Sequence, residues 1–133
     1  MADAEKIQEH LSLSRTYLEA AKVLAKEDLL EPGMFNALHA IELAVKAALF
    51  TVIEDDILTH QVAGLFGKHF RDKVGKELCK KVAVMLTRYN IPRYPDEEGI
   101  DKDALEDAIA LGRKLVDEVV PELVRKAGNG VKR

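Results

Sequence analysis

Three polar side chains share one face of the most apolar stretch of this sequence, and they are the first candidates for chemistry. The stretch 35–53 reads FNALHAIELAVKAALFTVI. At about 100° per residue, His39, Glu42 and Lys46 fall within about a sixth of a helical turn, with Asn36 beside them. We call His39, Glu42 and Lys46 the polar seam. It is either a solvated stripe or the lining of a groove or subunit interface, where removal from water strengthens the charges.

A second candidate is the segment 88–94, which reads RYNIPRY. Arg88 and Arg93 carry the planar donor forks that bind phosphate, and Tyr94 offers a ring on which a base can stack. These groups suit a nucleotide or single-stranded RNA. Equally, the tyrosines can pack into the core while the arginines cap helix carbonyls. The acidic residues at 96–98 oppose a polyanion unless they point elsewhere.

The histidines and the single cysteine do not form a recognisable site. No pair of histidines has the i,i+4 spacing with which a helix holds a metal, and Cys79 has no nearby His or Cys in the sequence. Cys79 is therefore expected at a core position. There is also no glycine-rich phosphate loop and no nucleophile elbow. We predict neither a metal nor a cofactor. The four histidines are His10, His39, His60 and His69.

Bulk composition predicts one domain over residues 1–133, with residues 128–133 frayed. The 133 residues are 47% apolar and 32% charged, which is typical of a single globular unit. A net charge of -3 argues against a surface that is basic throughout, although a local basic patch is compatible with it. The first ten residues lack an export signal, and one cysteine suits a reducing compartment. We expect a cytoplasmic protein without a membrane span, because Glu42 and Lys46 interrupt the apolar stretch.

Apolar spacing places these candidates on helices. A first amphipathic helix is expected over 4–28, and Glu31-Pro32-Gly33 is expected to break the chain before the central helix at 35–53. A loop should follow at 54–56. A short helix at 60–70, capped by Thr59, comes next. A longer helix capped by Asp72 follows and ends before Pro92.

The last helix is expected to begin at Asp101, which can cap it, and to end at 128–130, which reads GNG. Pro121 predicts a bend or break between Asp117 and Val120. No segment alternates with period two. The fold class is therefore an all-α, antiparallel up-and-down bundle of four to five helices.

Three motifs in this helical setting resemble the HEPN family (higher eukaryotes and prokaryotes nucleotide-binding). They are the stretch 36–49, NALHAIELAVKAAL, then Thr59 with His60, then the stretch 93–96, RYPD. The resemblance spans nearly the whole chain in order. It implies a helical bundle, frequent dimerisation, and a small nucleotidyltransferase as a common partner in toxin and antitoxin pairs.

Many members of that family are metal-independent ribonucleases with an Arg followed four to six residues later by a His. In such a site the His exchanges a proton and the Arg neutralises the scissile phosphate. Here Arg88 is followed by Arg93, and no histidine occurs after His69. An arginine stays protonated and cannot act as the base.

We therefore expect a non-catalytic HEPN module that forms a homodimer and binds a nucleotide, RNA or a nucleotidyltransferase partner. Its candidate contacts are Arg88, Arg93, Tyr94 and His60, together with the polar seam. The alternative is a ribonuclease with a non-standard site, in which folding brings His60 or His39 to Arg88.

Overall fold

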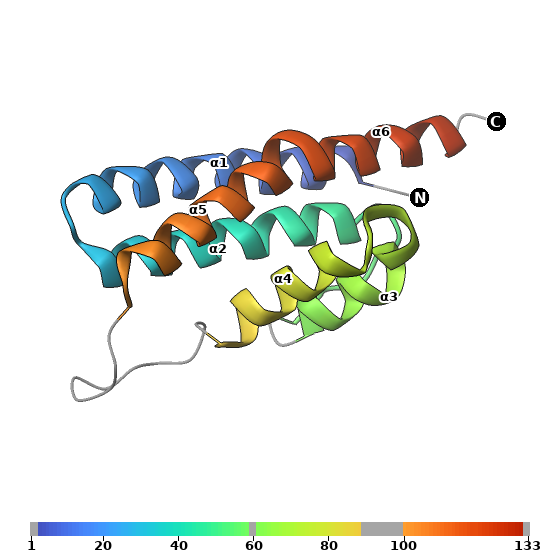
Figure 1. Ribbon diagram of the computed structural model, residues 1–133. Coiled ribbons are helices and arrows are strands. Elements are labelled where there is room, and N and C mark those ends of the chain that lie inside the picture. Colours follow the sequence, from blue (N-terminus) through green and yellow to red (C-terminus); the bar gives the residue numbers. More distant parts are fainter. Residues whose placement is uncertain (1–2, 59–60, 89–99, 132–133) are drawn as a thin grey trace.

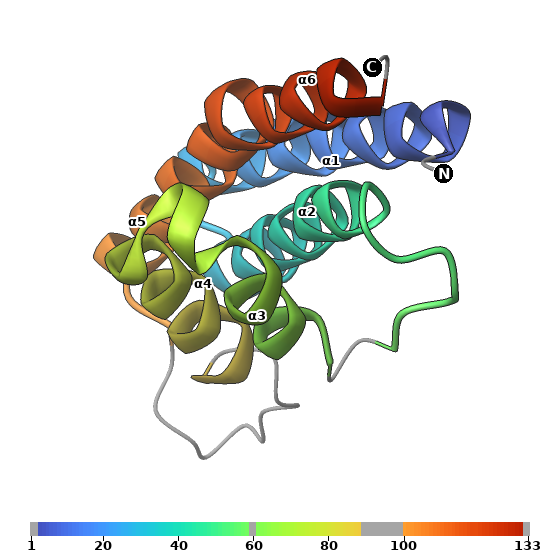
Figure 2. The same ribbon diagram turned by 90° about the vertical axis from the view of Figure 1, so that its right-hand side faces the viewer.

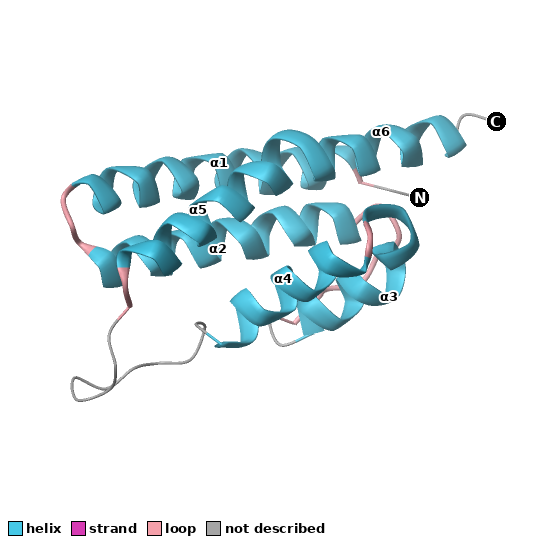
Figure 3. Ribbon diagram, in the orientation of Figure 1, coloured by secondary structure: helices cyan, strands magenta, loops and turns pink. Residues whose placement is uncertain are grey.

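Helices are the only regular secondary structure in the described part of the chain. The computed structural model describes residues 3–58, 61–88 and 100–131, and gives only the backbone of Arg88 and of 129–131. Within these ranges there is no strand (Figure 3). The predicted all-α class is confirmed. The elements are α1 (Ala4–Lys26), α2 (Leu30–Leu49), α3 (Val62–Val74), α4 (Lys76–Arg88), α5 (Lys102–Lys114), a π-helical segment (Leu115–Val119) and α6 (Val120–Val131).

Helix α1 forms as its apolar spacing predicts. Asp3 caps it by accepting a hydrogen bond from the backbone N–H of Lys6 at 3.1 Å. Its apolar stripe is buried: Ile7, Leu11, Leu18, Ala21 and Ala25 are all at most 9% exposed. Burial of this stripe against the rest of the bundle stabilises the helix more than its own propensity does.

The chain reverses earlier than the sequence suggested, so the break predicted at Glu31-Pro32-Gly33 is wrong. The turn is made by Asp28, which has a φ of 57°. The N–H of Leu29 donates to the carbonyl of Leu24 at 2.9 Å, and the N–H of Asp28 donates to the carbonyl of Ala25 at 3.1 Å. This is the usual hydrogen-bond pattern of a helix that ends in a left-handed residue, here an aspartate instead of glycine.

Pro32 and Gly33 instead belong to the first turn of α2. Proline is tolerated there because the first backbone N–H groups of a helix have no partner within it. A Cβ built on Gly33 would come within 2.9 Å of the Leu105 side chain. The glycine therefore allows α5 to approach α2 closely.

Helix α2 is central to the fold, as its composition predicts, although its bounds differ from 35–53. It runs from Leu30 to Leu49, and 13 of its 20 residues are buried. It is in contact with every other helix of the described chain. Where α1 crosses it, the hydroxyl of Ser14, itself fully buried, donates to the carbonyl of Ala40 at 2.7 Å.

The middle of the chain forms a helical hairpin whose bounds differ from the prediction. The loop expected at 54–56 is present, and α3 begins at Val62 with Gln61 at its N-cap position. Thr59 lies outside the described residues. Asp72 is inside α3, so it is not the cap of the next helix. The two helices are separated by Gly75, whose φ of 96° favours glycine.

The last helical region is long. Its α-helical hydrogen bonding is interrupted close to the place where Pro121 predicts a bend or break. Asp101 caps α5 by accepting from the N–H of Ala104 at 2.7 Å. Five π-helical residues, Leu115–Val119, then precede α6. Pro121 has no N–H and crowds the carbonyl four residues earlier, and a π turn relieves both problems without ending the helix. The helix continues through 128–130 to Val131, so the end predicted there is wrong.

The helices form two groups around α2. Figure 1 shows α1 and the continuous α5 to α6 region on one side of α2, with the α3–α4 hairpin on the other. The end view in Figure 2 shows the same arrangement. Helix α4 runs opposite to α5, as an up-and-down bundle requires.

Candidate functional site

The polar seam is not a solvated stripe. The Nζ atom of Lys46 lies 3.1 Å from the Oε2 atom of Glu42, and their side chains are only 18% and 12% exposed. An i,i+4 ion pair on a helix surface is worth little, but shielding from water strengthens the attraction between the charges. The pair is therefore a largely buried polar feature of the central helix.

His39, the third member of the seam, packs against α1. Its ring meets the ring of Tyr17 edge-on, with centroids 4.5 Å apart and planes at 89°. This geometry places the positive edge of one ring on the negative face of the other. The contact fixes where α1 and α2 meet at the surface.

Exposed apolar side chains flank that contact. Phe35 lies four residues before His39 and is 69% exposed, and Leu13 lies four residues before Tyr17 and is 48% exposed. Residues four apart on a helix share a face. We call Leu13, Tyr17, Phe35 and His39 the α1–α2 face. Large exposed apolar residues grouped in this way are typical of interaction surfaces.

The other described histidines have structural contacts of their own. His10 hydrogen-bonds through Nδ1 to the carbonyl of Lys6 at 2.8 Å and packs edge-on against Phe50. His69 lies beside the ring of Phe70. Among the described residues, no three His, Cys, Asp or Glu side chains are grouped so that they could hold a metal.

Four predicted contact residues have no described side chain. Arg88 ends α4, and its side chain lies outside the described part of the structure. His60, Arg93 and Tyr94 lie outside it entirely. Their role as binding contacts remains a prediction from the sequence.

Cys79 packs beside the core of the bundle, as predicted. Partial burial raises the pKa of its thiol, and the nearby positive charge of Arg71 only partly opposes that shift. A thiol with a raised pKa is mostly protonated near neutral pH and is a poor nucleophile. The surroundings of Cys79 therefore do not activate its thiol.

The structure reveals a basic surface that reasoning from motifs missed. Residues 62–88, which form α3 and α4, hold seven Lys or Arg and two Asp or Glu, for a net charge of +5. The other residues hold 13 Lys or Arg and 21 Asp or Glu, for a net charge of -8. We call 62–88 the basic hairpin. Net charge averaged over a sliding window of the sequence shows the same contrast, so this basic surface could have been predicted from the sequence.

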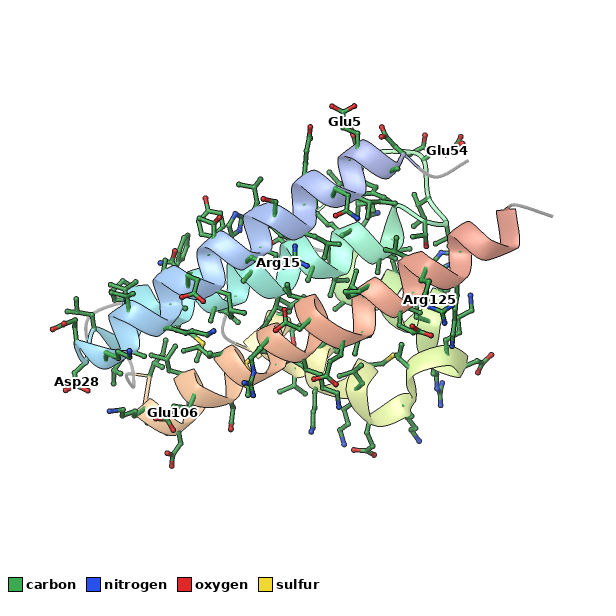
Figure 4. The ribbon with its side chains drawn as sticks, turned by 90° about the horizontal axis from the view of Figure 1, so that it is seen from above. Glu5, Arg15, Asp28, Glu54, Glu106 and Arg125 are labelled. Carbon is green, nitrogen blue, oxygen red and sulfur yellow. The ribbon has the colours of Figure 1, made fainter. Side chains whose placement is uncertain are left out.

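The cations of the basic hairpin whose side chains are described have no ion-pair partner among the described residues. Every ion pair between described residues uses a cation from outside α3 and α4. Acidic residues such as Glu5, Asp28, Glu54 and Glu106 lie at other edges of the molecule (Figure 4). A concentration of unpaired cations is the electrostatic signature of an anion-binding surface.

Comparison with known protein families identifies the fold. Residues 7–124 match the HEPN domain. The chain belongs to the HEPN family. That match runs from the first turn of α1 to the first turn of α6 and includes all of α2 to α5. The resemblance of the sequence motifs to this family is confirmed.

A comparison with curated proteins found no significant match. Within the described residues, no helix of this HEPN domain is long and apolar enough to cross a membrane.

Proposed function

We propose that this chain is a non-catalytic cytoplasmic HEPN module that binds nucleotide or RNA through the basic hairpin and the residues after it. The observation that carries the proposal is the charge of +5 on residues 62–88, within a chain of net charge -3. The hairpin ends at Arg88, and the sequence continues to Arg93 and Tyr94. Together these residues supply phosphate-binding donors and a ring for stacking.

The absence of the family's histidine from its expected place supports a binding role instead of catalysis. Arg88 is followed five residues later by Arg93, which cannot accept a proton near neutral pH. Cleavage of RNA by the family mechanism needs such a proton acceptor.

Calorimetry with nucleotides and a cleavage assay with RNA test this function. We expect heat of binding that falls when Arg88, Arg93 or Tyr94 is replaced by alanine, and no cleavage in the absence of metal. Metal-free cleavage that His60→Ala or Arg88→Ala abolishes would instead establish the ribonuclease alternative. If neither nucleotide nor RNA binds, the proposal loses its support.

We also infer that two copies associate through the α1–α2 face. Phe35 is 69% exposed at the start of an otherwise buried helix, and Leu13 adds to the same face. Phe35→Asp should convert a dimer to a monomer in analytical ultracentrifugation. Val23→Asp is the matched control, because Val23 is 59% exposed but lies on another side of α1. A dimer that survives Phe35→Asp would contradict this location.

A small nucleotidyltransferase is the protein partner that the family suggests, in a pair of toxin and antitoxin type. A pull-down of the product of the adjacent gene tests it. Retention of that protein on the immobilised HEPN chain is expected, and its loss with Phe35→Asp would show that the partner needs the dimer.

A further inference from the structure

A groove of about 530 Å³ separates α4 from α5. Helix α4 packs on α3 and α2, whereas α5 packs on α1 and α2. The two helices therefore share α2 as a support without closing over one another. They run in opposite directions (Figure 1).

The groove is long enough to bind a short stretch of helix. Its walls are 77–85 on α4 and 107–114 on α5, about two turns of each helix. Two turns are enough to receive apolar side chains spaced i, i+4 and i+7 on a docked helix.

The floor of the groove is aliphatic. Leu78 and Leu111 are 8% and 7% exposed and form the edge of the core. Met85 lies beside them, and Val84 is 43% exposed at the rim. Among the residues that the structure describes, none that lines the groove is aromatic. These residues therefore offer a surface for leucine-like anchors but no ring on which a nucleic acid base could stack.

The rim of the groove is more positive than negative. Lys80, Lys81 and Lys114 line it, against Glu77 and Asp107. None of these three lysines forms an ion pair with a described residue. Because the basic hairpin supplies one wall, its excess positive charge extends along that side of the groove. A complementary ligand carries negative charge beside an apolar stripe.

We propose that this groove binds an acidic amphipathic helix of a partner protein. Aliphatic anchors on one face of that helix would fill the floor, and flanking carboxylates would meet the three lysines. This groove shares the α4 wall with the basic hairpin proposed to bind nucleotide or RNA, but its apolar floor and its α5 wall lie outside the nucleotide contacts proposed at the end of α4.

Fluorescence polarisation with a defined probe tests the proposal. The probe is a labelled synthetic peptide of about four helical turns, with leucines at i, i+4 and i+7 and glutamates beside them. Two comparison peptides have every glutamate replaced by glutamine, or the same composition with the leucines scrambled. We expect saturable binding of the probe and weaker binding of both comparison peptides.

Matched protein variants locate the site. Lys80→Glu with Lys81→Glu should weaken probe binding about tenfold or more, because like charges then face each other across the interface. Arg15→Glu with Lys26→Glu makes the same change of charge on α1, away from the groove, and should leave binding within about twofold. Val84→Glu tests the apolar rim. Circular dichroism and thermal unfolding confirm that each variant is folded.

Three results would overturn the proposal. They are no saturable binding of the probe, equal binding of the scrambled peptide, or equal losses for the groove and α1 variants. If the groove variants weaken binding of a short single-stranded RNA but leave peptide binding unchanged, the groove is part of an RNA surface instead. None of these results decides whether the chain binds nucleotide, because calorimetry tests that proposal separately.

Discussion

Helices α1 and α2 form one antiparallel pair and α3 and α4 form another. The two pairs differ in whether their polar side chains have partners within the structure. In the first pair, Ser14 bonds across to α2, and Glu42 and Lys46 pair with each other. In the basic hairpin, the lysines point to solvent without ion-pair partners among the described residues. Satisfied polar groups within a packed core serve stability, whereas unpaired surface charges attract ligands of opposite charge. The comparison therefore distinguishes the scaffold from the surface that we propose to bind nucleotide or RNA.

The largest effect expected from this comparison is on stability. Ile41→Ala should lower the free energy of unfolding by about 2–5 kcal/mol, because Ile41 is fully buried in α2 and its loss leaves a cavity. Val84→Ala on α4 should change it by less than about 0.5 kcal/mol, since Val84 is 43% exposed. Urea denaturation measures both. Similar losses would mean that Val84 is packed as closely as Ile41, which its exposure contradicts.

The next effect concerns the buried ion pair of the seam. A double-mutant cycle with Glu42→Gln and Lys46→Met should give a coupling of about 1–2 kcal/mol, because both side chains are largely shielded from water. The corresponding cycle on the exposed Glu122 and Arg125 pair of α6 should give a clearly smaller coupling. Equal couplings would show that burial does not strengthen the seam.

The smallest effect is the pH dependence that Cys79 adds. Burial raises the pKa of this thiol in the folded chain. As pH rises, the thiol of the unfolded chain therefore loses its proton before the thiol of the folded chain does. The stabilisation that the protonated thiol gives to the fold is complete below the pKa of the unfolded chain, and it is lost as pH rises through the pKa of the folded chain. The stability advantage of wild type over Cys79→Ala should shrink between about pH 7 and about pH 10. A constant difference in urea unfolding across that range would contradict the assignment.

Apolar periodicity was sufficient to predict the helices and most of the core. The stripe on α1 and the burial of α2 follow from side-chain spacing, which reports directly on packing. Chain reversals were harder. Proline and glycine signal a break only outside the first turn of a helix, and the turn at Asp28 depends on an αL conformation that aspartate only sometimes adopts.

The candidate site was predictable only in part. The spacing of His39, Glu42 and Lys46 predicted one helix face, but not its burial, which depends on elements distant in sequence. The contact between Tyr17 and His39 joins two helices, so no local pattern encodes it. The basic hairpin was visible as a charge window, whereas the groove depends on how α4 and α5 rest on α2.

The central claim is that the basic hairpin binds nucleic acid while α1 and α2 form the scaffold. Anisotropy of a labelled single-stranded RNA across a salt series tests it most directly, comparing wild type with Lys68→Ala/Lys76→Ala and with the α1 control Arg15→Ala/Lys26→Ala. All four residues are exposed. We expect affinity to fall steeply with salt, and the hairpin variant to reduce the slope of log K against log salt by about 1.4, since each phosphate contact on a single strand contributes about 0.7. The same slope for both variants, or no RNA binding by wild type, would contradict the claim.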